Sequence, residues 1–132
     1  MKKEITYVKV RYAETDQMGV VYHGNYAQYL EIARIDWLQQ LGISYKAMEE
    51  EGIMLPVYEL ILRFKKSAKF DDLLKIETFL VEKPSVRIKF HYKIFNEAEE
   101  LLTEAETTLI FMDMEQNRPI RCPEYIIQKL DF

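Results

Sequence analysis

The chain has 132 residues, of which 48% are hydrophobic and 30% are charged, and these proportions indicate one compact domain with a core. The 18 basic and 22 acidic residues give a net charge of -4, so the composition predicts neither a nucleic-acid partner nor an anionic membrane partner, although local basic patches remain compatible with it. The N-terminal MKKEITYVKV lacks an apolar signal core and no segment reaches bilayer-spanning length, so we expect a cytoplasmic protein without membrane insertion.

The first half of the chain predicts a strand, a loop and two helices. Alternation over residues 5–12 indicates a strand, and residues 13–22 follow as a loop. A long helix is expected over residues 25–41, with a polar side that includes Arg34 and a buried apolar face made of Tyr26, Leu30, Ala33, Trp37 and Leu41. Gly42 can end this helix, and Ser44 can cap a second helix that runs to Glu51.

From residue 55 onward the hydrophobic period changes to two. Strands are predicted over residues 55–64, 73–83, 85–95 and 101–114, and we expect them to pair as a meander. The clearest is 85–95, with an apolar face of Val86, Ile88, Phe90, Tyr92 and Ile94. A turn at 116–119 and a short helix near 123–130 complete the chain. About five strands with one long helix, in this order, predict an α+β fold.

The predicted sheet buries most apolar surface if it curls around the long helix. Both edges of the sheet then remain exposed, and edge-to-edge pairing of two subunits is one way to cover them. The residue pattern alone also leaves a monomeric, cystatin-like arrangement open.

Residues 11–34 place an acid, a glycine turn and a histidine directly before the long helix. The first N–H groups of a helix have no internal partner and favour negative charge. Asp16 lies upstream in the loop, Gly19 allows the turn, and His23 and Gly24 lead into the helix. A carboxylate there can face an electrophile whose oxygen rests on those N–H groups, which are the minimum parts of an acyl-transfer or hydrolysis site.

A family resemblance is carried by Arg11-Tyr12, Glu14-Thr15-Asp16, Met18-Gly19-Val20-Val21-Tyr22-His23, Asn25-Tyr26, Tyr29, Glu31 and Ala33-Arg34. On these residues the chain resembles the hotdog-fold acyl-CoA thioesterases, specifically the 4-hydroxybenzoyl-CoA thioesterase group and its bacterial YbgC-like branch. The likeness extends more weakly over the rest of the chain, through Phe70-Asp71-Asp72, and departs from the family at Lys66-Ser67, where many relatives carry a proline. It implies a single hotdog domain over residues 1–132.

The resemblance also implies hydrolysis of an acyl-CoA thioester, with Asp16 as the catalytic carboxylate and the backbone N–H of His23 polarising the thioester carbonyl. An ionised aspartate can attack the carbonyl or activate water, and the sequence leaves both routes open. The family further implies a homodimer or a dimer of dimers with sites at the subunit boundary. The alternatives are an acyl-carrier-protein thioesterase and a non-catalytic module that binds acyl-CoA or an acyl-carrier protein.

Further candidates for substrate binding are Tyr22, Gly24, Asn25 and Tyr26 near the helix start, and Arg87, Arg118 and Arg121 for the CoA phosphates. The tyrosines fit the core equally well, and Asn25 can instead cap the helix or hold the Asp16 loop. His23 and His91 lack metal-ligand spacing, so we expect no metal and no other cofactor. Cys122, the only cysteine, is expected to be structural.

Overall fold

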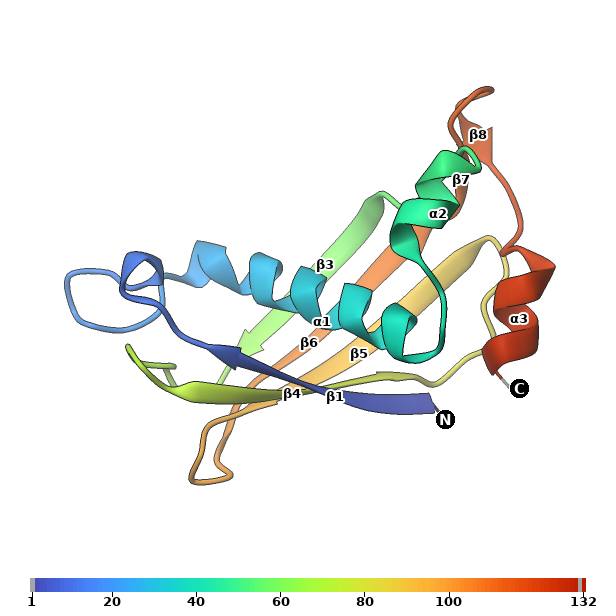
Figure 1. Ribbon diagram of the computed structural model, residues 1–132. Helices are drawn as coiled ribbons and strands as arrows, with labels where there is room; N and C mark the ends of the chain where they lie inside the picture. The colour runs from blue at the N-terminus through green and yellow to red at the C-terminus, as the bar shows by residue number, and fades with distance from the viewer. Residues whose placement is uncertain (1, 131) are drawn as a thin grey trace.

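Five antiparallel strands form the main sheet, in the order β1-β4-β5-β6-β3 (Figure 1). The computed structural model describes residues 2–130 and 132. The strands of this sheet are β1 Lys2–Lys9, β3 Val57–Phe64, β4 Leu73–Leu80, β5 Arg87–Phe95 and β6 Leu101–Ile110. A smaller sheet, of order β2-β7-β8, consists of β2 Ile53–Met54, β7 Met112–Asp113 and β8 Arg118–Pro119.

The sheet curls around one long helix, α1, and the other helical segments are short (Figure 1). Helix α1 spans Tyr26–Gln40, and the short segments are η1 Tyr12–Glu14, η2 His23–Asn25, α2 Tyr45–Glu50 and α3 Glu124–Leu130. The predicted apolar face of α1 is confirmed, because Tyr26, Leu30, Ala33 and Trp37 are buried. The Trp37 ring meets Phe90 of β5 edge to face, with the ring centroids 5.2 Å apart. The predicted α+β architecture is therefore confirmed.

Two local predictions from the sequence are also confirmed. Ser44 caps α2, since its Oγ accepts a hydrogen bond from the Ala47 N–H at 3.0 Å. Along β5, burial alternates as predicted, and the inward side chains are those of Ile88, Phe90, Tyr92 and Ile94.

The prediction that the strands pair as a single meander is wrong for β3. Strands β4, β5 and β6 pair in sequence order, but β3 lies beside β6 and β1 takes the place beside β4. The connection from β3 to β4 makes backbone hydrogen bonds outside the main sheet. The Val21 N–H donates to the Ala68 carbonyl at 2.9 Å, and Val20 forms a β-bridge with Lys69. The connection is thereby fixed against the loop that precedes α1, at the end of the molecule where the candidate site lies.

Two further predictions from the sequence are wrong, namely where the first strand ends and that Arg34 lies on the polar side of the helix. Strand β1 ends at Lys9 rather than at residue 12, because the chain turns into η1. Arg34, expected on the polar side of α1, is buried, and its Nη1 donates to the Tyr92 hydroxyl at 3.4 Å. The curled sheet covers more of the helix than its apolar stripe indicates. None of the helices in residues 2–130 has the length and apolar character needed to cross a membrane.

Candidate active site

Asp16 lies in the loop between η1 and η2, and its side chain closes a tight turn. Its Oδ1 accepts hydrogen bonds from the N–H groups of Met18 at 2.8 Å and Val20 at 3.4 Å. Gly19 has a φ of +78°, a left-handed conformation that glycine adopts without strain. Oδ2 of Asp16 accepts no hydrogen bond from the residues that the structure describes. One carboxylate oxygen therefore fixes the turn while the other is available to a reacting group.

A cavity of about 280 Å³ opens beside Asp16, between this loop, the start of α1 and the end of β3. It brings together three of the predicted site residues, Asp16, His23 and Tyr26. The rest of its lining is Val20, Val21, Phe64, Lys65, Lys66 and Ser67. None of these further lining residues was among the site residues predicted from the sequence. Four of them follow one another at the end of β3, far along the chain, and no local pattern indicates that they meet Asp16.

His23 begins the short 3-10 turn η2, which leads directly into α1. The Asn25 N–H donates to the Tyr22 carbonyl at 2.9 Å and the Tyr26 N–H donates to the His23 carbonyl. Within residues 2–130, the N–H groups of His23 and Gly24 donate to no other residue, as expected at the start of a helical segment. His23 thus provides an unpaired backbone donor in a residue that lines the cavity.

Tyr22 and Gly24 flank His23 and shape the turn without lining the cavity. The Tyr22 ring is exposed and packs on the His23 imidazole, with 4.4 Å between the ring centroids. A Cβ added to Gly24 would lie 2.6 Å from Cε2 of Tyr22, so a larger residue at this position must displace the ring or the turn. Glycine at this position therefore allows the Tyr22 ring to pack closely on the turn.

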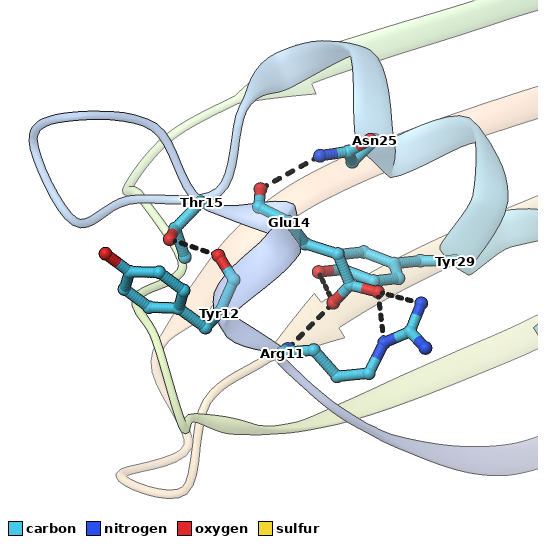
Figure 2. Close-up of polar contacts among 6 residues, drawn as sticks. All are labelled: Arg11, Tyr12, Glu14, Thr15, Asn25 and Tyr29. Carbon is cyan, nitrogen blue, oxygen red and sulfur yellow. Dashed lines mark hydrogen bonds and ion pairs between the residues drawn. The ribbon is translucent and has the colours of Figure 1, made fainter.

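Asn25 holds the loop rather than the helix end. Its Nδ2 donates to the Glu14 carbonyl at 2.9 Å (Figure 2), whereas its side chain makes no capping hydrogen bond to α1. The sequence left open whether Asn25 caps the helix or holds the Asp16 loop, and the structure shows the contact with the loop. Asn25 does not line the cavity, and its amide nitrogen is bonded to Glu14. It therefore contacts the site through Glu14.

Glu14 is the polar site residue that the sequence analysis did not single out. Its side chain is buried, and it accepts hydrogen bonds from Arg11 and from the Tyr29 hydroxyl (Figure 2). Burial raises the pKa of the Glu14 carboxyl, but these hydrogen bonds and the Arg11 charge outweigh it, so the pKa lies below its ordinary value. Glu14 accepts from the Arg11 N–H three residues earlier, as the glutamate of a capping box does, but an arginine at the first position does not mark such a box in a sequence.

Tyr26 belongs both to the core and to the cavity wall. Its side chain is buried, its ring lies edge to face with Phe64 at 5.0 Å between centroids, and its hydroxyl accepts from the Ala68 N–H at 3.4 Å. Burial raises the pKa of Tyr26 above its ordinary value. Tyr26 therefore fits both interpretations of the sequence, as a core residue and as a residue of the candidate site.

The three candidate phosphate-binding arginines lie at the opposite end of the sheet from Asp16. Arg87 begins β5, and its guanidinium carbon lies 4.8 Å from the centre of the Tyr58 ring on β3. It lines a second cavity of about 310 Å³, whose other charged residues are Lys83, Lys89, Glu59 and Glu82. Arg118 and Arg121 are exposed and line neither cavity. Within one chain, the structure does not bring these arginines to Asp16.

His91 and Cys122 lie outside the cavity at Asp16. The His91 ring stacks on Phe79 on the outer face of the sheet, with its Nδ1 3.4 Å from Glu106. The Cys122 thiol is buried, and burial raises its pKa to about 12. A thiol with that pKa is a poor nucleophile at neutral pH, which agrees with a structural role for this cysteine.

Comparisons with known proteins agree on one family. Residues 10–130 match the thioesterase-like superfamily. YneP of Bacillus subtilis, provisionally named an acyl-CoA thioesterase, is 37% identical over 120 residues that cover 91% of this chain and 85% of YneP. The acyl-CoA thioester hydrolase YbgC of Escherichia coli O6:H1 is 31% identical, with 91% and 90% covered. A DHNA-CoA thioesterase from Staphylococcus aureus superposes with a TM-score of 0.90 at 43% identity, with 95% and 84% covered.

Proposed function

The chain belongs to the thioesterase-like superfamily, as a YbgC-like acyl-CoA thioesterase with the hotdog fold, and we propose that Asp16 is its catalytic carboxylate. The observation that carries this proposal is the cavity in which Asp16 and His23 lie together at the start of α1. An ionisable acid, an unpaired backbone donor and an apolar wall converge there. No other group on the cavity wall combines a negative charge with a position beside the helix start.

In the proposed complex the thioester carbonyl oxygen accepts from the His23 N–H, where the helix start favours the negative charge that develops during the reaction. Asp16 then acts by one of two routes. Its carboxylate attacks the carbonyl carbon and expels CoA thiolate, leaving a mixed anhydride that water hydrolyses, or it takes a proton from the water that attacks. Both routes end in the free acid and CoA, and both require an ionised Asp16.

The acyl group is proposed to lie against Tyr26 and Phe64, whose rings stand beside Val20 and Val21 in the apolar part of the cavity wall. Aromatic and short aliphatic acyl groups both fit such a wall. The name of the Staphylococcus aureus relative, a DHNA-CoA thioesterase, favours the aromatic class. An acyl-carrier protein presents the same thioester on the same pantetheine arm, so it remains the alternative carrier for this site.

We propose that the active form contains at least a two-fold dimer joined through β3. This strand lies at one end of the strand order, so one of its edges is unpaired, and it exposes the apolar side chains of Val57, Tyr58, Leu60 and Phe64. An exposed apolar edge strand is a site for pairing with another strand. A second copy of the same strand covers both edges at once, and pairs of such dimers can associate into tetramers.

Antiparallel pairing of two β3 strands would also complete the site. It places the end of one β3, where Phe64 lines the Asp16 cavity, beside the start of the partner's β3. Tyr58 lies at that start and contacts Arg87. The arginine that lies far from Asp16 in its own chain therefore approaches the Asp16 cavity of the other subunit, where it can bind the phosphates of CoA.

Release of thiol from a panel of acyl-CoA thioesters tests the proposed activity. We expect turnover of at least one aromatic or short aliphatic thioester without added metal, and faster turnover of CoA thioesters than of the same acids on an acyl-carrier protein. Binding of acyl-CoA without thiol release would identify a non-catalytic module. Sedimentation at the assay concentration tests the assembly, and a fully active monomer would exclude the boundary site.

A further inference from the structure

The side chain of Glu14 ties the loop before Asp16 to the helix. Its Oε1 accepts hydrogen bonds from the Arg11 N–H and from the Tyr29 hydroxyl, each at 2.8 Å. Its Oε2 lies 2.9 Å from both Nε and Nη2 of Arg11 (Figure 2). Tyr29 is buried on α1, whereas the Arg11 side chain is exposed. The carboxylate is therefore anchored on the inside by the helix and neutralised on the outside by Arg11.

The backbone of Glu14 ties the same loop to the turn that carries the proposed carbonyl-binding N–H. Its carbonyl oxygen accepts from the Tyr22 N–H at 3.0 Å and from the Asn25 Nδ2 at 2.9 Å. Tyr22 and Asn25 are the residues on either side of His23 and Gly24. One residue thus holds the turn at both of its flanks.

We propose that Glu14 is a positioning residue, which sets Asp16 and the His23 N–H at the separation that the transition state requires. The inference rests on the proposed thioester hydrolysis. Asp16 follows Glu14 by two positions, so a shift of Glu14 is transmitted to the carboxylate on one side and to His23 on the other. Displacement of catalytic groups by about 1 Å costs on the order of 100-fold in rate. Glu14 itself does not line the cavity and acts through its neighbours.

Four variants separate positioning from simple stabilisation. Glu14→Ala removes every side-chain contact. Glu14→Gln keeps an oxygen for the Arg11 N–H and the Tyr29 hydroxyl, as glutamine does in a capping box. Tyr29→Phe removes one buried hydroxyl from the network. Tyr92→Phe is its matched control, because it removes a buried hydroxyl bonded to Thr107 at 2.6 Å and to Arg34 at 3.4 Å, away from the cavity.

We expect Glu14→Ala to lower kcat by about 10- to 100-fold and to change KM by less than about twofold, because the lost contacts act on the transition state. Glu14→Gln should recover kcat to within about fivefold of the wild type. Tyr29→Phe should lower kcat by about threefold or more, whereas Tyr92→Phe should not lower it. Amide hydrogen exchange at Tyr22 and Asn25, whose N–H groups donate to the Glu14 and Tyr22 carbonyls, should accelerate in Glu14→Ala and not in Tyr92→Phe.

Suppose that Asp16→Asn loses activity whereas Glu14→Ala and Tyr29→Phe keep the wild-type kcat. This result would overturn the positioning role and leave the proposed function intact. Equal losses in Tyr29→Phe and Tyr92→Phe would also overturn it. If Glu14→Ala does not fold, the pair of tyrosine variants decides the question. Absence of thiol release by the wild type would overturn the proposed function, and unchanged exchange at Tyr22 and Asn25 in Glu14→Ala would overturn the positioning role independently of any activity.

Discussion

The two ends of the main sheet contribute in different ways to the proposed site. At one end, Asp16, His23 and Tyr26 come from one short stretch of sequence and meet in one cavity. At the other end, Arg87 lines a second cavity, which Asp16 does not reach within the same chain. The residues proposed to act on the thioester therefore lie close together in the sequence. The arginine proposed to bind the CoA phosphates can reach them only if two subunits pair.

The largest effect is expected at the chemical end. Asp16→Asn keeps the size of the side chain and its Oδ1 contacts but removes the charge, so we expect kcat to fall by about 10²- to 10⁴-fold while the fold is retained. Thiol release measures the rate, and circular dichroism with thermal unfolding checks the fold. A rate near that of the wild type would remove Asp16 from the mechanism.

Gly24→Ala perturbs the helix start without changing a charge. Its new Cβ would lie 2.6 Å from the Tyr22 ring, so the ring or the turn that carries the His23 N–H must shift, and we expect kcat to fall by about tenfold. The double variant Tyr22→Ala with Gly24→Ala relieves this clash and is the control. Equal rates in the single and double variants would show that the contact with Tyr22 is not the cause.

Arg87→Ala should affect binding rather than chemistry. Loss of one charge-assisted phosphate contact is expected to raise KM for acyl-CoA by about fivefold to tenfold and to change kcat by less than about twofold. An N-acetylcysteamine thioester of the same acid has no phosphates and should show no difference. Lys93→Ala, an exposed position on the same strand outside the Arg87 cavity, is the matched control. An effect on the short thioester would place Arg87 in a different role.

The smallest effect concerns the pH dependence of stability at Glu14. Its folded-state pKa lies below its ordinary value of 4.5, so its charged contacts stabilise the fold above that pH and are lost as the pH falls through the folded-state value. Glu14→Gln should lower the free energy of unfolding by about 1 kcal/mol at pH 7, with the difference shrinking below pH 4.5.

Urea unfolding at several pH values measures this difference. Glu49→Gln, an exposed position on α2, is the control and should show no such pH dependence. A constant difference between wild type and Glu14→Gln at all pH values would contradict the charged network around Glu14.

Much of the fold follows from periodicity that can be read in the sequence. The faces of α1 and β5 and the Ser44 cap depend on neighbours within a few residues, and all three were predicted. The place of β3 was not, because strand order depends on long-range pairing, and the β3–β4 connection is held by the distant residues Val20 and Val21. Arg34 was misassigned for the same reason, since a strand remote in sequence buries it.

The candidate site divides in the same way. Asp16, His23 and Tyr26 were predicted from one contiguous motif, and the structure brings them to one cavity. Phe64 and the residues after it could not be predicted, because they reach the cavity through the tertiary fold. Glu14 was not predicted either, because its burial and its contact with Tyr29 depend on how the loop packs against α1.

A mixed dimer tests most directly whether the two ends of the sheet meet across the subunit boundary. One subunit carries Asp16→Asn and the other carries Arg87→Ala, and different affinity tags allow the mixed species to be purified. The boundary model predicts one site with both native residues, and therefore about half of the wild-type kcat per dimer with the wild-type KM for acyl-CoA. A mixed dimer with the raised KM of the Arg87→Ala homodimer would show that Arg87 serves the Asp16 of its own chain and would contradict the account.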